Sequence, residues 1–148
     1  MKRQRIYVDT SVLGGCFDPE FSPWSNDLVE DFRACRFQPV LSEVTAAEVA
    51  GAPEPVRALH AELLVLPADV LPVTAAYEAK GILGQRFRND MLHIALASIA
   101  DVDVLVSWNF RHIVRLDKIR LFGAVNLELG YKPLPIYSPR EVATYGEE

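Results

Sequence analysis

Acidic side chains stand at three separated positions of the sequence, one at the end of an apolar run and two in the first turn of a helical pattern. Asp9 directly follows the apolar run at 5–8. Glu48 lies in the first turn of the helix pattern after a second apolar run, and Asp90 opens the strongest helix pattern of the chain. If the apolar runs are parallel strands, strand carboxyl ends and helix amino ends share one edge, where ligands bind. The sequence therefore predicts that these carboxylates converge, together with Asn109 after a fourth apolar run.

Carboxylates that are brought together repel each other, and each raises the pKa of its neighbours. A bound Mg²⁺ or Mn²⁺ is the natural compensation, because these cations take oxygen ligands and often complete their shell with a substrate phosphate. Such an ion lowers the pKa of a bound water and stabilises charge on a transferring phosphorus. The pattern therefore indicates phosphate chemistry.

Each of these residues also has a purely structural interpretation. Asp9 and the residues after it can cap a helix. Glu48 has the capping-box spacing from a threonine, and Asp90 suits a helix amino terminus. Asn109 alone suits a turn, and we expect His93 to be a buried or interfacial histidine. The joint occurrence of the acids on one edge favours a site.

The elements that must position these residues alternate along the chain. We expect strands at 5–8, 39–41, 70–73, 102–106 and 134–137. We expect helices at 24–37, capped by Ser25 or Asn26, and at 45–51, 55–66, 74–87, 89–100, 116–129 and 138–141. This alternation predicts an α/β fold with a mostly parallel sheet and helices on both faces.

Length and composition bound the class of protein. The chain has 148 residues, 50% of them hydrophobic, and a net charge of −5, which predicts one packed domain over 1–148. Two isolated cysteines, Cys16 and Cys35, give neither a disulfide framework nor zinc-ligand spacing. Because no signal peptide and no membrane-length apolar run is evident, we expect a cytoplasmic protein.

Basic residues gather near the predicted acidic edge, although the chain as a whole is acidic. Arg86 and Arg88 precede Asp90, and Arg111 follows Asn109. We expect these three arginines to bind the phosphate backbone of a substrate. An ordinary solvated surface remains the alternative.

Four segments together resemble the PIN-domain family, in particular VapC-like toxins of toxin–antitoxin pairs. They are Val8–Ser11, Thr45–Glu48, Asp90–Ala97 and Leu105–Phe110. Each segment is short, but their order and spacing extend from residue 6 to about residue 137. Four such segments in order form a fairly specific signal.

The resemblance implies a PIN-like three-layer α/β/α sandwich of about five strands and an Mg²⁺- or Mn²⁺-dependent ribonuclease. Asp9, Glu48 and Asp90 would be metal ligands and catalytic residues. Thr10, Ser11 and Ser107 would lie next to these ligands and orient water or metal without binding the metal themselves.

Asn109 stands where many PIN proteins carry Asp. Its carbonyl can accept a hydrogen bond but brings no charge, so the resemblance leaves a second metal open. We count Asn109 among the expected catalytic residues.

The resemblance also implies partners: an RNA substrate, a cognate antitoxin protein and a second copy of the chain. The apolar cluster Phe17, Phe21, Pro23 and Trp24 is a candidate surface for either protein partner, and ordinary helix packing is its alternative. Whether the role is that of a toxin or of RNA processing stays open.

Rival functions differ in the residues they require. A phosphatase with an aspartyl nucleophile would want a second Asp where Ser11 stands. A phospho-receiver domain would want an acidic pair and a late Lys, and neither is evident. A catalytically silent PIN-like module that binds RNA or protein remains open because of Asn109.

Overall fold

The computed structural model describes residues 3–83 and 89–143, apart from the side chain of residue 73. Its centre is a five-stranded sheet in the order β3-β2-β1-β4-β5 in which every strand pair is parallel. The strands are β1 (Gln4–Val8), β2 (Phe37–Leu41), β3 (Asp69–Val70), β4 (Val104–Val106) and β5 (Ile136–Tyr137). The expected α/β class with a mostly parallel sheet is confirmed.

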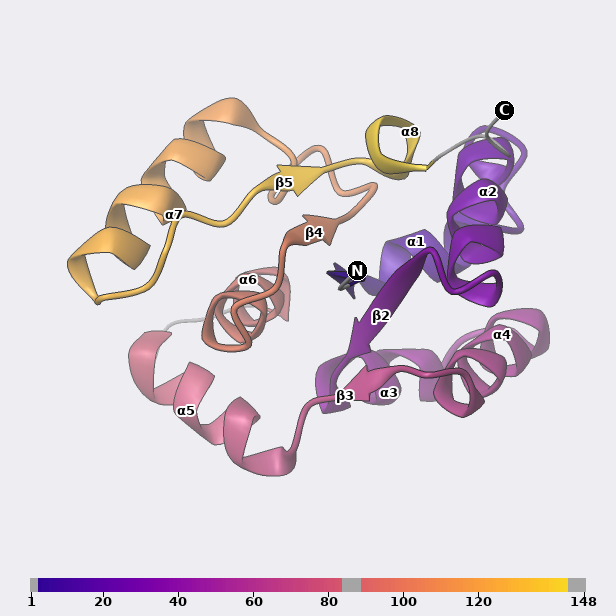
Figure 1. The fold of residues 1–148 in the computed structure, drawn as a ribbon, viewed down its shortest axis with the longest axis horizontal. Coiled ribbons are helices and arrows are strands. Elements are labelled where there is room, and N and C mark those ends of the chain that lie inside the picture. The colour runs from indigo at the N-terminus through magenta and orange to yellow at the C-terminus, as the bar shows by residue number, and fades with distance from the viewer. Residues whose placement is uncertain (1–2, 84–88, 144–148) are drawn as a thin grey trace.

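Helices cover both faces of this sheet, as right-handed crossovers between parallel strands require. They are α1 (Thr10–Gly15), α2 (Ser22–Arg33), α3 (Glu43–Ala50), α4 (Glu54–Val65), α5 (Val73–Leu83), α6 (Asn89–Ile99), α7 (Leu116–Glu128) and α8 (Pro139–Val142). Figure 1 shows α1, α2 and α4 on one side of the strands and α5, α6 and α7 on the other. Within the described ranges, no helix is long and apolar enough to span a membrane.

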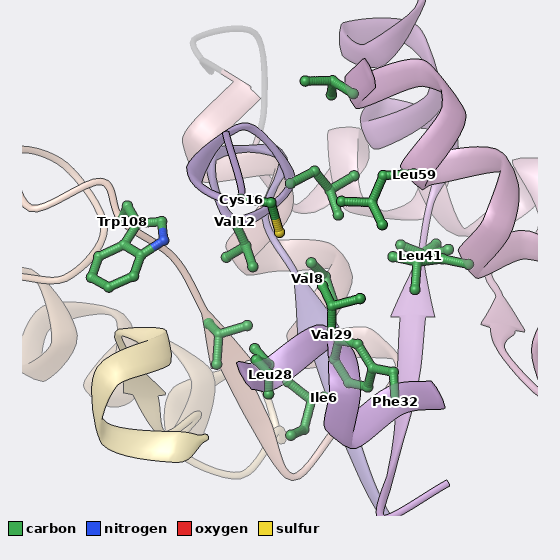
Figure 2. Close-up of a cluster of buried hydrophobic side chains, with 14 of the residues drawn as sticks. Ile6, Val8, Val12, Cys16, Leu28, Val29, Phe32, Leu41, Leu59 and Trp108 are labelled. Atoms are coloured by element: carbon green, nitrogen blue, oxygen red, sulfur yellow. The ribbon is translucent and has the colours of Figure 1, made fainter. Parts of the chain in front are cut away.

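The strands are buried on both faces because their side chains alternate between two apolar cores. Ile6 and Val8 of β1 pack with α1, α2 and α4 in the first core, which Figure 2 shows. Tyr7, between them in the chain, belongs to the second core with α6. All three side chains have no exposed surface. This explains why β1 is a continuous apolar run.

Two helix starts differ from the sequence expectation. Helix α2 begins at Ser22 with Phe21 as its N-cap residue, so Ser25 and Asn26 lie inside the helix and the predicted cap is wrong. Pro23 in the first turn favours this earlier start. Helix α3 is capped by Ser42, whose hydroxyl accepts from the backbone N–H of Thr45. The capping-box interpretation of Glu48 is therefore wrong, and its carboxylate is available for other contacts.

A short helix follows β1 at once, in agreement with the structural interpretation of Asp9 as a helix cap. The side chain of Asp9 caps α1 by accepting from the backbone N–H of Ser11 at 3.4 Å. Strand β3 is shorter than expected, because α5 already begins at Val73. The short final helix α8 carries the predicted capping box of Ser138 and Glu141.

Candidate active site

The structure brings the three acids to one pocket at the carboxyl ends of the strands. Asp9 follows β1, Glu48 lies on α3, and Asp90 lies in the first turn of α6. All three line a pocket of about 710 Å³, together with His93 and Asn109. Thus four separate segments contribute polar groups to the same cavity.

Asp9 is held firmly by two serine hydroxyls. Its Oδ2 accepts from Ser11 Oγ at 2.6 Å and from Ser107 Oγ at 2.9 Å. The residue is 6% exposed, and its Oδ1 lies 3.5 Å from Nε2 of His93. One carboxylate oxygen is therefore used for anchoring, while the other faces the remaining polar groups.

The same two serines tie the segment after β1 to the segment after β4. Ser11 Oγ accepts from the backbone N–H of Trp108 at 2.9 Å, and Ser107 Oγ accepts from that of Asn109 at 2.9 Å. These bonds fix Asp9 relative to the loop that carries Asn109. Ser11 and Ser107 thus contact Asp9, and their role in orienting water or metal stays a prediction.

Glu48 receives three hydrogen bonds. Its Oε1 accepts from Thr10 Oγ1 at 2.5 Å and from His93 Nε2 at 2.8 Å, and its Oε2 accepts from Asn89 Nδ2 at 3.1 Å. Burial raises the pKa of this carboxyl group, but the bonds from His93 and Thr10 outweigh burial and lower its pKa to about 2. Glu48 is therefore ionised at neutral pH.

Behind Glu48 runs a buried chain of hydrogen bonds. His93 is 1% exposed, and its Nδ1 lies 2.7 Å from the hydroxyl of Tyr7, which in turn lies 2.7 Å from Ser42 Oγ. Burial raises the pKa of Tyr7 above its usual value, so the phenol keeps its proton. Nε2 of His93 faces two carboxylates and must carry a proton, so it acts as a donor. The expectation of a buried histidine is confirmed.

The other two predicted residues make local backbone contacts. Asp90 Oδ1 accepts from the N–H of Met91 at 3.0 Å. Asn109 Oδ1 accepts from the N–H groups of Arg111 at 3.2 Å and His112 at 2.9 Å, which is how Asn caps a turn. A catalytic role of Asn109 stays a prediction.

Of the three predicted phosphate-binding arginines, the structure describes only Arg111. Arg111 is exposed on the turn after Asn109 and does not line the pocket. Arg86 and Arg88 lie outside the described residues. Binding of phosphate by these three side chains stays a prediction.

The carboxylates suit a hard cation in kind, although not in their present spacing. Asp9, Glu48 and Asp90 offer only oxygen ligands, as Mg²⁺ and Mn²⁺ prefer. Among the described residues, however, no three His, Cys, Asp or Glu side chains stand close enough to hold one ion. His93 lies between Asp9 and Glu48 and donates to Glu48. A metal would therefore require side-chain rotation within the pocket.

Several residues that shape the site carry no sequence signal of their own. Tyr7 lies in a predicted strand and Ser42 directly follows one, yet both belong to the buried series of hydrogen bonds behind His93. Asn89 reads as a helix start and contacts Glu48. The sequence gives no polar role to Trp108, yet its indole Nε1 donates to Ser25 Oγ at 2.7 Å. The packing of α3 against α6 brings Asn89 to Glu48. Two other contacts join β1 to α6 and the loop after β4 to α2.

No protein-family model matches the sequence, and no curated protein is significantly similar to it. Among solved structures, the fold is similar to a chain in the crystal structure of VapBC2 from Rickettsia felis bound to a DNA fragment from their promoter. The TM-score is 0.54 at 11% sequence identity, over 91% of this chain and 98% of the other. A likeness at this identity shows the fold, so any activity must be argued from the residues of the pocket.

Proposed function

We propose that this protein is a metal-dependent endoribonuclease of the PIN-like, VapC-like kind. The observation that carries the proposal is the convergence of Asp9, Glu48 and Asp90 on one pocket from three separate elements. Buried and half-buried carboxylates cost stability unless function or pairing offsets the cost. A pocket with three of them, at the strand edge where ligands bind, supports a catalytic site.

Two groups of residues would hold the two carboxylates in place. Ser11 and Ser107 hold Asp9, so that its Oδ1 is presented in a fixed position. Thr10 and His93 hold Glu48 in its ionised form. These bonds limit the conformations of both carboxylates, although a bound metal would still require side-chain rotation within the described part of the pocket.

Asp90 would complete a set of three oxygen ligands for Mg²⁺ or Mn²⁺ with Asp9 and Glu48. When bound, such an ion supplies an acidic water at neutral pH and neutralises charge on the phosphate. Asn109 would then orient water or substrate at the rim of the pocket.

The structural neighbour supports a further part of the proposal. Its description names VapBC2, bound to a DNA fragment from the promoter. We infer by analogy that this chain is the toxin of a toxin–antitoxin pair, that an antitoxin protein covers the pocket, and that the chain forms a homodimer in the cytoplasm. The helices in the described ranges contain no membrane span, in agreement with that location.

One observation favours a second candidate, a catalytically silent module that binds RNA or protein. Within the described parts of the chain, no three suitable side chains are near enough to hold a metal, and Glu48 accepts three hydrogen bonds. The two functions differ in whether RNA cleavage depends on metal.

The test is cleavage of mixed cellular RNA by purified protein with Mg²⁺, Mn²⁺ or EDTA. We expect cleavage that requires metal and that Asp9→Asn abolishes, with circular dichroism unchanged. Asp117→Asn, whose side chain is 63% exposed on α7, is the matched control and should cleave like the wild type. Cleavage by a folded Asp9→Asn protein, or equal cleavage in EDTA, would contradict the nuclease assignment.

A further inference from the structure

Beside the acidic pocket lies a group of aromatic side chains that the catalytic residues do not use. We call Phe21, Trp24, Trp108 and Phe110 the aromatic shelf. The ring of Trp108 is stacked on Phe21, with centroids 4.3 Å apart and planes at 19°. Trp24 and Phe110 contact it at 6.2 Å and 6.1 Å in tilted and edge arrangements. Residues from α2 and from the loop after β4 thus build one surface.

The centre of the shelf is fixed in place. Trp108 is 8% exposed, and its Nε1 donates to the buried hydroxyl of Ser25. The backbone of α1 passes so close that a Cβ on Gly15 would lie 2.6 Å from Nε1 of Trp108. Since Ser11 Oγ bonds both the backbone of Trp108 and Asp9, the shelf and the carboxylate have a fixed relative position. Figure 2 shows Trp108 at the edge of the first core.

The shelf connects the acidic pocket to a second pocket of about 380 Å³. Phe21 and Trp108 line both cavities, and Phe110 lines the second. Phe110 is 49% exposed, so part of its side chain is accessible to a ligand. The guanidinium of Arg140 lies 5.0 Å from the ring centroid of Trp24, and both residues line the second pocket. A chain of atoms leaving the acidic pocket would therefore pass over aromatic rings.

We propose that the aromatic shelf binds an unpaired RNA base next to the phosphodiester in the acidic pocket, with Phe110 as its exposed stacking face. This inference rests on the proposed function. Aromatic rings stack bases of every kind, and bases inside a duplex are not accessible to them. The shelf would therefore select single-stranded RNA over double-stranded RNA.

The charges around the shelf suit a neutral base better than a phosphate. Glu20 and Glu141 line the second pocket together with Arg140. Glu141 Oε1 accepts from the backbone N–H and hydroxyl of Ser138, so this carboxylate is held in the cap of α8. A pocket lined by one cationic and two anionic side chains does not favour a phosphate. An uncharged base stacked on Phe110 is not repelled by these carboxylates.

Binding of a short single-stranded RNA that carries 2-aminopurine at one position tests this inference in EDTA, where no hydrolysis is expected. Stacking quenches the fluorophore, so a scan of its position reports which nucleotide meets the shelf. We expect Phe110→Leu to weaken binding about tenfold and to restore the fluorescence, because leucine keeps the contact with Trp108 but has no π face. Phe110→Tyr should bind like the wild type.

Tyr77→Leu is the matched control, because Tyr77 is an exposed aromatic residue on α5 that lines neither cavity. It should leave affinity unchanged, and duplex RNA should bind wild type and Phe110→Leu alike. If Phe110→Leu and Tyr77→Leu bind single-stranded RNA equally well, the proposed base-binding role of the shelf is contradicted. The same holds if the wild type does not bind RNA. If Phe110→Leu weakens RNA binding but the wild type does not cleave RNA with any metal, the nuclease assignment is contradicted and the base-binding site is supported.

Discussion

The acidic pocket has two sides that are built differently. On the anchored side, His93 donates to Glu48, and its Nε2 lies 3.5 Å from Oδ1 of Asp9. Two serine hydroxyls donate to the other oxygen of Asp9. On the turn side, Asp90 and Asn109 accept bonds from nearby backbone N–H groups of their own segments. The anchored side is preorganised by partners far away in sequence, whereas these bonds of Asp90 and Asn109 come from their own segments. We therefore expect the anchored side to determine stability and the turn side to adapt to a ligand.

Removal of His93 should give the largest effect on stability. His93→Ala leaves a cavity behind Glu48 and deprives Tyr7 and Glu48 of a buried partner. We expect a loss of about 3 kcal/mol in the free energy of unfolding, measured by urea denaturation. Asp90→Asn on the turn side should cost less than about 1 kcal/mol. Similar costs for the two variants would break the distinction between the sides.

Acid should destabilise the anchored side through Glu48. Its pKa is lowered from 4.5 to about 2 in the folded protein, so its contribution is fully present above about pH 4.5. That contribution is lost as the pH falls from 4.5 towards 2. We expect about 2 kcal/mol, less than the full shift implies because 29% of the side chain is exposed. Glu48→Gln should show a flatter stability profile over this range, and equal slopes would contradict the bonding of Glu48.

The two glycines of α1 should respond in opposite directions. A Cβ on Gly15 would meet Trp108 and Ser25 at 2.6–2.7 Å, whereas a Cβ on Gly14 meets nothing within 4 Å. We expect Gly15→Ala to cost about 1.5 kcal/mol by overpacking. Gly14→Ala should stabilise α1 by about 0.5 kcal/mol through helix propensity. Thermal unfolding of both variants measures the difference, and a harmless Gly15→Ala would show that Trp108 is free to move.

On the turn side, Asn109 should tolerate an acid but not its removal. Asp can accept the same two bonds from the N–H groups of Arg111 and His112, so Asn109→Asp should change stability by less than about 0.5 kcal/mol. Asn109→Ala loses both bonds and should cost about 1 kcal/mol. A large loss in Asn109→Asp would mean that the neighbouring carboxylates repel it, and the turn side would then be as tightly coupled as the anchored side.

The sequence predicts the parts of this fold that follow from periodicity. Five apolar runs became the five strands, and the order of strands and helices gave the parallel sheet that brings Asp9, Glu48 and Asp90 to one edge. That step needs only the rule that parallel strands share their carboxyl edge. The positions of these acids were therefore predictable without any distance.

The contacts behind the acids were not predictable from the sequence, because they join residues that no local pattern relates. Tyr7 meets His93 across 86 positions, and Trp108 meets Ser25 across 83. The misplaced caps have a related cause. Ser25 and Thr45 suit helix starts, but Pro23 and Ser42 set those starts earlier. When several neighbouring side chains could cap a helix, the backbone conformation decides which one does. The sequence pattern does not determine that conformation.

The most direct test of the account is binding of Mn²⁺ to the wild type and to Asp9→Asn, Glu48→Gln and Asp90→Asn, followed by calorimetry and by the electron paramagnetic resonance of the bound ion. We predict one site in the wild type that each of the three substitutions weakens by at least tenfold, with Asp117→Asn unchanged. Absence of a site in the folded wild type, or undiminished binding by Asp9→Asn, would contradict the claim that these three carboxylates form one metal centre.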